Sequence, residues 1–411
     1  MLWLGVARSS RVLTALIGVS TLVFGAFGSA GAVSSGTGQG LKLVAEIPFE
    51  DGSHMEFASI KGRDYAFVSE LKGLNSVLRV IDVTVPNKPK VVAKSPCTGF
   101  QGNVQVSHDK KTLVVGIDDN LAGIPGGAKT SCPHTGETGI GFITLDISNP
   151  KRPRSLGFAD TPKGSHSLAT HPTKPYVYSG DGFPESPGTM QVWSIKNPAR
   201  PKLVTTLDTG AHSPHDLAFN RNGTMAATAN VINLHLLDTR DPAKPKIVHT
   251  TQCPGCLHTH EARFTPDGKR LVVNDEYPVS PACPGGLMYF YDLTHEGSTY
   301  GLTLSGAYTA GEKGTDPDGA APILCTPHIF DISADGKRIA ASWHESGLKY
   351  LDISKTAGVT AGKEQIVPGG VKELGWYSNS GGDMFSAKLF KGPYVYAVDV
   401  TVGFQVFKVT K

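Results

Sequence analysis

The chain of 411 residues lacks the short motifs that mark the common nucleotide-binding and serine-hydrolase chemistries. It contains no P-loop, no dinucleotide-binding glycine fingerprint and no G-x-S-x-G nucleophile elbow, so the sequence does not support those functions. It also carries little net charge, +3 at pH 7 from 39 basic and 36 acidic residues. A near-neutral surface gives no reason to expect nucleic acid or an anionic membrane as a partner.

Residues 1–32 have the composition of a secretory signal peptide. Arg8 and Arg11 form a charged start, the run from Val12 to Phe27 is apolar, and Ala30-Gly31-Ala32 matches an A-x-A cleavage site. An uncleaved membrane anchor is the alternative, but the apolar run is short and is broken by glycine and serine. Cleavage would remove two arginines and leave a net charge of about +1. We therefore expect a secreted or extracytoplasmic protein, at the cell surface or in the periplasm, without a transmembrane segment.

A strand followed by a proline-containing turn recurs seven times. Four copies are close, LRVIDVTVPNKPKVV, ITLDISNPKRPRSL, MQVWSIKNPARPKLV and LHLLDTRDPAKPKIV, and looser copies begin at Met288, Leu348 and Phe404. The segment Pro214–Val248 shows the whole unit, four short apolar runs separated by Gly, Asn and Pro, which indicates a four-stranded antiparallel sheet. A PxxP ligand for SH3-type domains is the weaker interpretation, since the prolines always follow a strand. Seven four-stranded repeats of roughly 50 residues predict an all-β, seven-bladed β-propeller.

The two ends of the repeat array complement each other. Residues 33–40 are rich in Gly, Ser and Thr and are predicted to be a flexible linker. Leu41–Phe49 resembles a fourth strand with no blade before it, and Phe404–Val409 a third strand with no fourth after it. We therefore expect the N-terminal strand to close the last blade, so that residues 41–411 form one domain without an open sheet edge.

The first four copies of the repeat resemble the LVIVD repeat, which is found in exported bacterial and archaeal propeller proteins. The resemblance covers nearly all of the chain after the signal peptide. It implies a β-propeller fold and an extracytoplasmic location. It implies no activity, because that family as a whole has none assigned.

Histidine recurs at one position in most of the blades. Counting back 15 residues from the end of each second strand, or 16 in the first and last blades, reaches His54, Asn103, His166, His215, His260, His328 and Asp383. The first strand of a propeller blade is the innermost, and its start opens on the same face as the end of the second. We therefore expect a ring of histidines at one mouth of the central channel.

A wider ring of polar residues should lie behind these histidines. It comprises Glu70, Asp118, Asp181, Asn230, Asp275 and Asp399, with Asp119, Glu276, His344 and Glu345 beside it. Imidazoles backed by carboxylates are typical of a transition-metal site. The five histidines are thus candidate metal ligands, and the residues behind them, with Asn103 and Asp383, are candidates to orient ligands or bind substrate. Five exceed the share of one ion, so some would bind substrate, act as acid or base, or hold a second ion.

A structural role for the histidines is the alternative. In WD-type propellers a histidine in each blade hydrogen-bonds an acidic residue and ties neighbouring strands together. We favour the metal site because the Asn and Asp that replace histidine in two blades also suit a ligand set. The alternation of residues along a strand cannot tell whether the ring faces the axis.

Six cysteines in an exported chain predict three disulfides. Cys97 and Cys132 flank one hairpin and are the predicted pair, whereas adjacent loops carry the other four and leave three pairings open, among Cys253, Cys256, Cys283 and Cys325. The C-x-x-C spacing of two of these also matches metal-binding and redox motifs. A structural bridge is favoured there, since no thioredoxin-like pattern surrounds it.

The sequence leads to two functional hypotheses. The first is a monomeric metal-dependent enzyme that acts on a small organic substrate, with oxidation as the candidate reaction. Copper is favoured because imidazole suits it and the compartment is oxidising, and zinc or iron are alternatives. Selenium-binding proteins and methanethiol oxidases are similar in architecture, although their C-x-x-C does not align with Cys253 and Cys256. The second is a non-enzymatic extracellular or cell-surface binding module with structural histidines.

Overall fold

The computed structural model describes residues 36–71, 76–118, 132–133, 139–161, 163–181, 188–276, 285–297, 299–310, 325–356 and 370–410. The predicted signal peptide, Asp119 and Cys283 lie outside these ranges. The part considered below belongs to a compact unit that spans Val33–Lys411. Within the described residues, no helix has the length and apolar character needed to cross a bilayer.

Among the described residues the strands form seven antiparallel sheets, which follow one another as blades 1 to 7. Blade 1 contains β3 (Gly52–Ile60), β4 (Arg63–Glu70), β5 (Leu78–Asp82) and β6 (Lys90–Ser95). Blade 2 contains β7 (Val104–Val106), β8 (Thr112–Ile117), β9 (Gly141–Asp146) and β10 (Arg154–Asp160). Blade 3 contains β11 (Leu168–Thr170), β12 (Tyr176–Gly180), β13 (Gly188–Ser194) and β14 (Lys202–Gly210). Blade 4 contains β15 (Asp216–Phe219), β16 (Met225–Asn230), β17 (Asn233–Asp238) and β18 (Lys246–Gln252).

The last three blades follow the same order. Blade 5 contains β19 (Thr259–Phe264), β20 (Arg270–Asp275), β21 (Met288–Glu296) and β22 (Thr299–Tyr308). Blade 6 contains β23 (Phe330–Ile332), β24 (Arg338–Ser342), β25 (Leu348–Asp352) and β26 (Lys372–Asn379), with β1 (Gly36–Gln39) at its edge. Blade 7 contains β27 (Met384–Leu389), β28 (Tyr394–Asp399), β29 (Gly403–Val409) and β2 (Leu41–Pro48).

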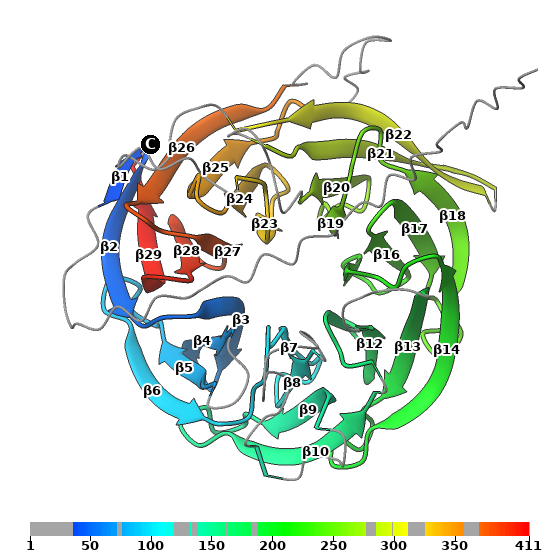
Figure 1. Ribbon diagram of the computed structural model, residues 1–411, viewed down its shortest axis with the longest axis horizontal. Coiled ribbons are helices and arrows are strands. Elements are labelled where there is room, and N and C mark those ends of the chain that lie inside the picture. Colours follow the sequence, from blue (N-terminus) through cyan, green and yellow to red (C-terminus); the bar gives the residue numbers. More distant parts are fainter. Residues whose placement is uncertain are drawn as a thin grey trace, which may run out of the picture. The chain divides into compact units, whose positions relative to one another are not determined.

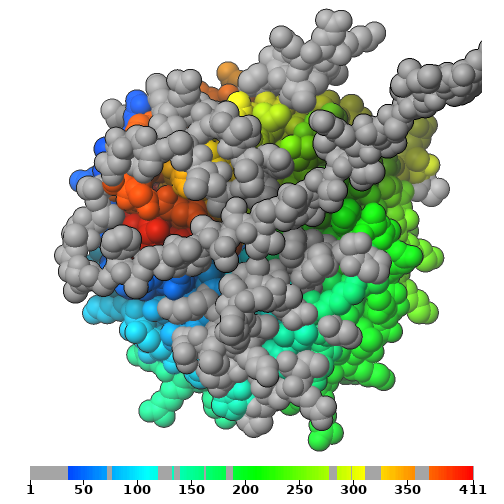
Figure 2. Space-filling model, viewed as in Figure 1, coloured from blue at the N-terminus to red at the C-terminus, as the bar shows by residue number. Residues whose placement is uncertain are grey.

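The first strands of the blades surround a central axis. Each of β3, β7, β11, β15, β19, β23 and β27 contacts the next, and β27 contacts β3, so the ring is closed (Figure 1). The same order of colours runs around the surface, where the red of the last blade lies beside the blue of the N-terminal strands (Figure 2). The predicted seven-bladed β-propeller is confirmed.

The apolar core lies between neighbouring blades rather than along the axis. Phe67 and Val80 of blade 1, for example, are fully buried in one cluster with Leu113 and Val115 of blade 2. The second strands β8 and β16 are buried along their whole length. Because burial of apolar area stabilises the contacts between blades, the channel itself is left to polar side chains.

The prolines of the repeat have a defined role in the turn after the third strand of blades 1 to 4. In the copy of blade 4, the N–H of Lys244 donates to the carbonyl of Asp241 (3.0 Å), with Pro242 between them. The three other close copies form the same bond, at Val85–Lys88, Asn149–Arg152 and Asn197–Arg200. Proline at the second position of such a turn sets φ in advance. The predicted proline-containing turn is therefore a tight β-turn.

The N-terminal strand closes the ring as predicted, but the predicted linker is partly wrong. β2 pairs antiparallel with β29 from Leu41 opposite Val409 to Pro48 opposite Gly403. Gly36–Gln39, however, form β1, which pairs antiparallel with β26. The glycines are needed for close packing, since a Cβ at Gly36 would overlap the hydroxyl of Tyr377. A composition that suggested flexibility instead lets the backbone lie directly on an aromatic ring.

The disulfide between Cys97 and Cys132 is confirmed. Of the pairings left open, the structure shows Cys253 bonded to Cys256. Cys325 also belongs to a disulfide, and Cys283 lies outside the described residues. The C-x-x-C segment is thus a bridge within one loop.

Closure of the last blade leads to a first prediction. A protein that begins at Asp51 lacks β1 and β2, leaves the edge of β29 open, and loses burial of Leu41 and its neighbour Leu43. We expect the free energy of unfolding to fall by roughly 3–5 kcal/mol and Tm to fall by about 5 °C. The open edge should also promote aggregation. Removal of residues 33–40 alone should have a smaller effect. A monomeric protein starting at Asp51 with unchanged Tm would show that β2 does not close the ring.

The two bridges allow a matched comparison. Cys97 and Cys132 are 35 residues apart and Cys253 and Cys256 only 3, so the chain-entropy relation gives about 4 kcal/mol for the first and about 2 kcal/mol for the second. Denaturant unfolding of the two double Cys→Ser variants measures both losses. Equal losses would contradict the entropic account.

Candidate functional site

Four of the five predicted histidines form an arc around one mouth of the channel. His166 and His215 bring their Nε2 atoms within 3.2 Å of each other. The ring centroids of His215 and His260 are 4.6 Å apart, and those of His260 and His328 are 4.3 Å apart. All four are only 5–7 % exposed and line the same cavity. Their side chains therefore face the axis.

The fifth histidine, His54, lines the same cavity but does not continue the row of adjacent histidine rings. Phe385 packs between it and His328, with ring centroids 5.4 Å from His54 and 4.2 Å from His328. The residue count placed Asp383 in the ring at this blade, and that placement is wrong. Asp383 instead hydrogen-bonds His344, and Phe385 takes its place beside the channel.

β-Bulges account for this difference and aim three of the side chains. Register shifts lie at Gly52–Met55 in β3, Thr259–Ala262 in β19 and Met384–Ser386 in β27. A bulge inserts an extra residue, bends the strand and re-aims a side chain. His54, His260 and Phe385 lie inside these segments, so counting residues alone could not fix which of them faces the axis.

Glu276 lies at the centre of the arc, although the sequence placed it only beside the outer ring. It follows β20, and its two carboxylate oxygens face different histidines. Oε2 is 3.6 Å from Nε2 of His260, whereas Oε1 is 3.2 Å from Nε2 of His344 and 3.8 Å from Nε2 of His328. A single carboxylate thus connects blades 5 and 6 inside the channel mouth.

His344 reaches this position from the turn between β24 and β25. Its φ is 41°, in the left-handed region, where a residue other than glycine costs about 1–2 kcal/mol. The conformation is held by its carbonyl, which accepts from the N–H groups of Gly347 (2.8 Å) and Met384 (3.1 Å). Its Nδ1 donates to Asp383 (2.7 Å). Backbone strain of this kind is concentrated at functional sites.

Two groups of these residues have a geometry that could hold a metal ion. One is His215, His260 and Glu276, and the other is Glu276, His328 and His344, with the donor atoms of each group within 4.8 Å of one another. His54 and His166 belong to neither group.

Acceptors behind the histidines set their tautomers. Asp118 lies 2.6 Å from Nδ1 of His166, and the carbonyl of Phe385 lies 2.6 Å from Nδ1 of His328. A carbonyl oxygen or an ionised carboxylate can only accept, so each Nδ1 carries the proton and each Nε2 keeps a lone pair. This is the arrangement that orients histidine ligands in metal sites. In His166 the Nε2 lone pair faces Nε2 of His215.

Most of the predicted outer ring has other partners. Glu70 binds Arg79 and the N–H of Val77, and Asp181 accepts from the hydroxyls of Thr189 and Ser213. Asp399 accepts hydrogen bonds from Asn379 and Thr401. Asn230 donates to the carbonyl of His212. Asn103 lines the cavity beside Gln105. Glu345 is half-buried next to His344. The expected carboxylate support is therefore found at Asp118 and Asp383.

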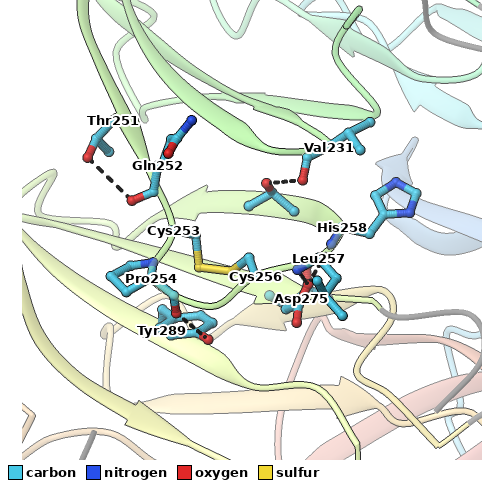
Figure 3. Close-up of a disulfide and its surroundings, with 12 residues drawn as sticks. Val231, Thr251, Gln252, Cys253, Pro254, Cys256, Leu257, His258, Asp275 and Tyr289 are labelled. Carbon is cyan, nitrogen blue, oxygen red and sulfur yellow. Dashed lines mark hydrogen bonds between the residues drawn. A yellow bond between two sulfur atoms is a disulfide. The ribbon is translucent and has the colours of Figure 1, made fainter. Parts of the chain in front are cut away.

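Asp275 supports the site through the backbone of the stapled loop (Figure 3). Its Oδ1 accepts from the N–H groups of Leu257 (2.9 Å) and His258 (2.8 Å), just after the Cys253–Cys256 bridge. The ring of His258 lies 4.4 Å from that of His215. His258 was not among the predicted ligands, although its spacing of two from His260 was a usable signal.

Burial keeps most of the arc neutral. Desolvation, reinforced by the charges of neighbouring histidines, holds the pKa well below 6.5 for His54, His215 and His260. Burial and His344 likewise lower the pKa of His328 to about 4. These imidazoles are therefore uncharged at neutral pH.

His344 and Glu276, in contrast, are held in their charged forms. Burial opposes the charged form of each, but Asp383 and Glu276 outweigh it and raise the pKa of His344 to about 10. The pKa of Glu276 is lowered, because the hydrogen bond from His344 and the nearby histidines outweigh its burial. The two therefore form a buried ion pair beside the neutral arc.

A second polar layer lines the same cavity below the histidines. It contains Asp216, Glu261, Arg263 and Lys388. Arg263 pairs with Glu261, and Lys388 lies 3.5 Å from Glu56. The floor of the cavity is therefore charged and internally paired, and sequence reasoning did not find it.

No protein-family model and no curated protein matches the chain. Among solved structures, it is similar to the β-propeller domain of Cps50 (Swd1) from Myceliophteria thermophila, with 12 % identity and a TM-score of 0.58 over 90 % of this chain and 100 % of that one. It is also similar to a functionally unknown protein from Desulfotomaculum acetoxidans DSM 771, with 16 % identity and a TM-score of 0.54 over 79 % and 89 %. These likenesses show the propeller fold alone, and membership of the LVIVD family stays a prediction.

The lowered histidine pKa values predict acid sensitivity of the metal-free protein. Between pH 6.5 and about 4 the unfolded chain binds a proton at His328 that the folded protein does not, so stability falls as the pH falls. The titration of His328 alone should lower the free energy of unfolding by about 2 kcal/mol between pH 7 and pH 4.5. Denaturant unfolding at both pH values should show a correspondingly smaller loss for His328→Gln. An equal loss in the variant and the wild type would contradict this assignment.

Proposed function

We propose that the protein is an exported metal-dependent enzyme whose transition-metal ligands are His215, His260, His328, His344 and Glu276. The observation that carries this proposal is the position of Glu276 between histidines from neighbouring blades. The Nε2 atoms of His260, His328 and His344 face this carboxylate. His215, His260 and His328 also line a polar cavity.

Buried nitrogen atoms without partners favour a metal site over a purely structural ring. Among the described residues, Nε2 of His258 and Nδ1 of His260 are buried and accept or donate no hydrogen bond. Each such atom costs about 1–3 kcal/mol in a folded protein. Histidines that served only to tie strands together would be expected to have their nitrogens satisfied, as those of His171 are.

Copper is the favoured ion, with zinc and iron next. Neutral imidazoles and one carboxylate suit all three, and the oxidising compartment implied by the disulfides favours a copper site. Bound copper would supply one-electron oxidation to a small organic substrate, with dioxygen as the final electron acceptor. The chain's own contribution is to orient the histidines through Asp118, Asp383 and the Phe385 carbonyl, and to hold a small polar substrate above the layer of Asp216, Glu261 and Arg263.

Metal content tests the proposal. The protein, produced with copper, zinc and iron available, should carry one or two ions by elemental analysis. His215→Ala and His260→Ala should lower metal affinity at least tenfold, whereas His108→Ala, in a turn away from the arc, should leave it unchanged. The structural alternative predicts the reverse for the first two variants, a loss of roughly 1–3 kcal/mol of stability with no metal to lose.

The reaction is tested separately, by dioxygen uptake of the copper-loaded protein with small thiols, phenols and amines. A wild-type protein that is isolated without metal and takes up none of the three ions in solution would refute the proposed function. It would leave a non-enzymatic binding module as the conclusion.

A further inference from the structure

We infer that the site binds two metal ions joined by the carboxylate of Glu276, one held also by His215 and His260 and the other by His328 and His344. This inference rests on the proposed function and specifies the centre in more detail. Two observations carry it, the division of the ligands into two groups and the way the two oxygens of Glu276 face apart.

The two groups share Glu276. Each contains two histidine nitrogens and one carboxylate oxygen within 4.8 Å of one another. Bonds from such donors to a first-row ion are about 2.0–2.2 Å long, so donors on one ion lie at most about 4 Å apart. Each group therefore needs only a small inward movement to hold its own ion.

The orientation of Glu276 fits a bridge. Oε2 faces His260, whereas Oε1 faces His344 and His328. A carboxylate that binds one ion through each oxygen can span the separation of about 3.5–4 Å that is usual for two-metal sites. Glu276 follows β20 of blade 5, which lies between the blades that supply His215 and His344.

The surroundings of the two positions support their separation. Nδ1 atoms of His328 and His344 are held by groups of blade 7, the carbonyl of Phe385 and Asp383. At the first position, the ring of His258 lies 4.4 Å from that of His215. Its Nε2 is buried and has no hydrogen-bond partner among the described residues. Each half of the centre is thus positioned by a different part of the fold.

Copper titration of the metal-free full-length protein tests the inference. We expect two Cu(II) ions per chain by elemental analysis after desalting, with both equivalents seen by calorimetry. Because the carboxylate couples the two spins, the integrated EPR intensity should be well below that of two isolated Cu(II) ions. Zn(II) should also bind in two equivalents, as a probe that cannot change its redox state.

Variants that remove one half each separate the alternatives. His260→Ala and His328→Ala should each keep one ion with the full EPR intensity of a single uncoupled Cu(II). Glu276→Gln should weaken both sites at least tenfold, and His108→Ala should keep two coupled ions. Near-UV circular dichroism checks that each variant is folded, and the wild-type stoichiometry and EPR intensity need no variant at all.

Each remaining outcome is decisive. A single ion that both half-site variants lose would overturn the two-ion centre and leave the proposed function standing. Two ions that are uncoupled and insensitive to Glu276→Gln would overturn the bridge. Absence of any bound ion would overturn this inference together with the proposed function.

Discussion

The structure depends on burial of apolar side chains between neighbouring blades. A four-stranded sheet has two apolar faces and cannot bury them alone, so each blade needs a blade on either side. Closure of the ring by β2 against β29 provides this for the first and last blades and removes an open sheet edge. Since the apolar contacts lie between blades, the innermost strands can present polar side chains to the axis without loss of core.

The chemistry of the candidate site follows from that closure. The starts of the inner strands meet at one mouth, and burial there disfavours charged imidazole, so His215, His260 and His328 stay neutral. Glu276 and His344 are charged in the same surroundings because each is the partner of the other. Neutral nitrogen donors beside one largely buried carboxylate form a donor set that suits a first-row transition metal.

The C-x-x-C bridge and Asp275 illustrate how the loops serve the site. The bridge closes the loop before β19, and Asp275 accepts hydrogen bonds from the backbone of Leu257 and His258 that follows it (Figure 3). A disulfide that a motif search would associate with redox chemistry acts here on the position of a neighbouring imidazole. The contacts of this loop, rather than its C-x-x-C spacing, therefore indicate its role.

The amino-acid sequence by itself determined the number of blades, the closure by Leu41–Pro48, the Cys97–Cys132 bridge and the presence of histidines at the starts of the inner strands. These features depend on local patterns and on regular spacing, which repeat from blade to blade. Tertiary structure alone decided that Glu276 lies among the histidines, that Phe385 replaces Asp383, and that Gly36–Gln39 form a strand. The reason is physical: a β-bulge changes which side chain faces the axis, a left-handed turn redirects His344, and the close packing of a glycine against Tyr377 depends on residues far away in the chain.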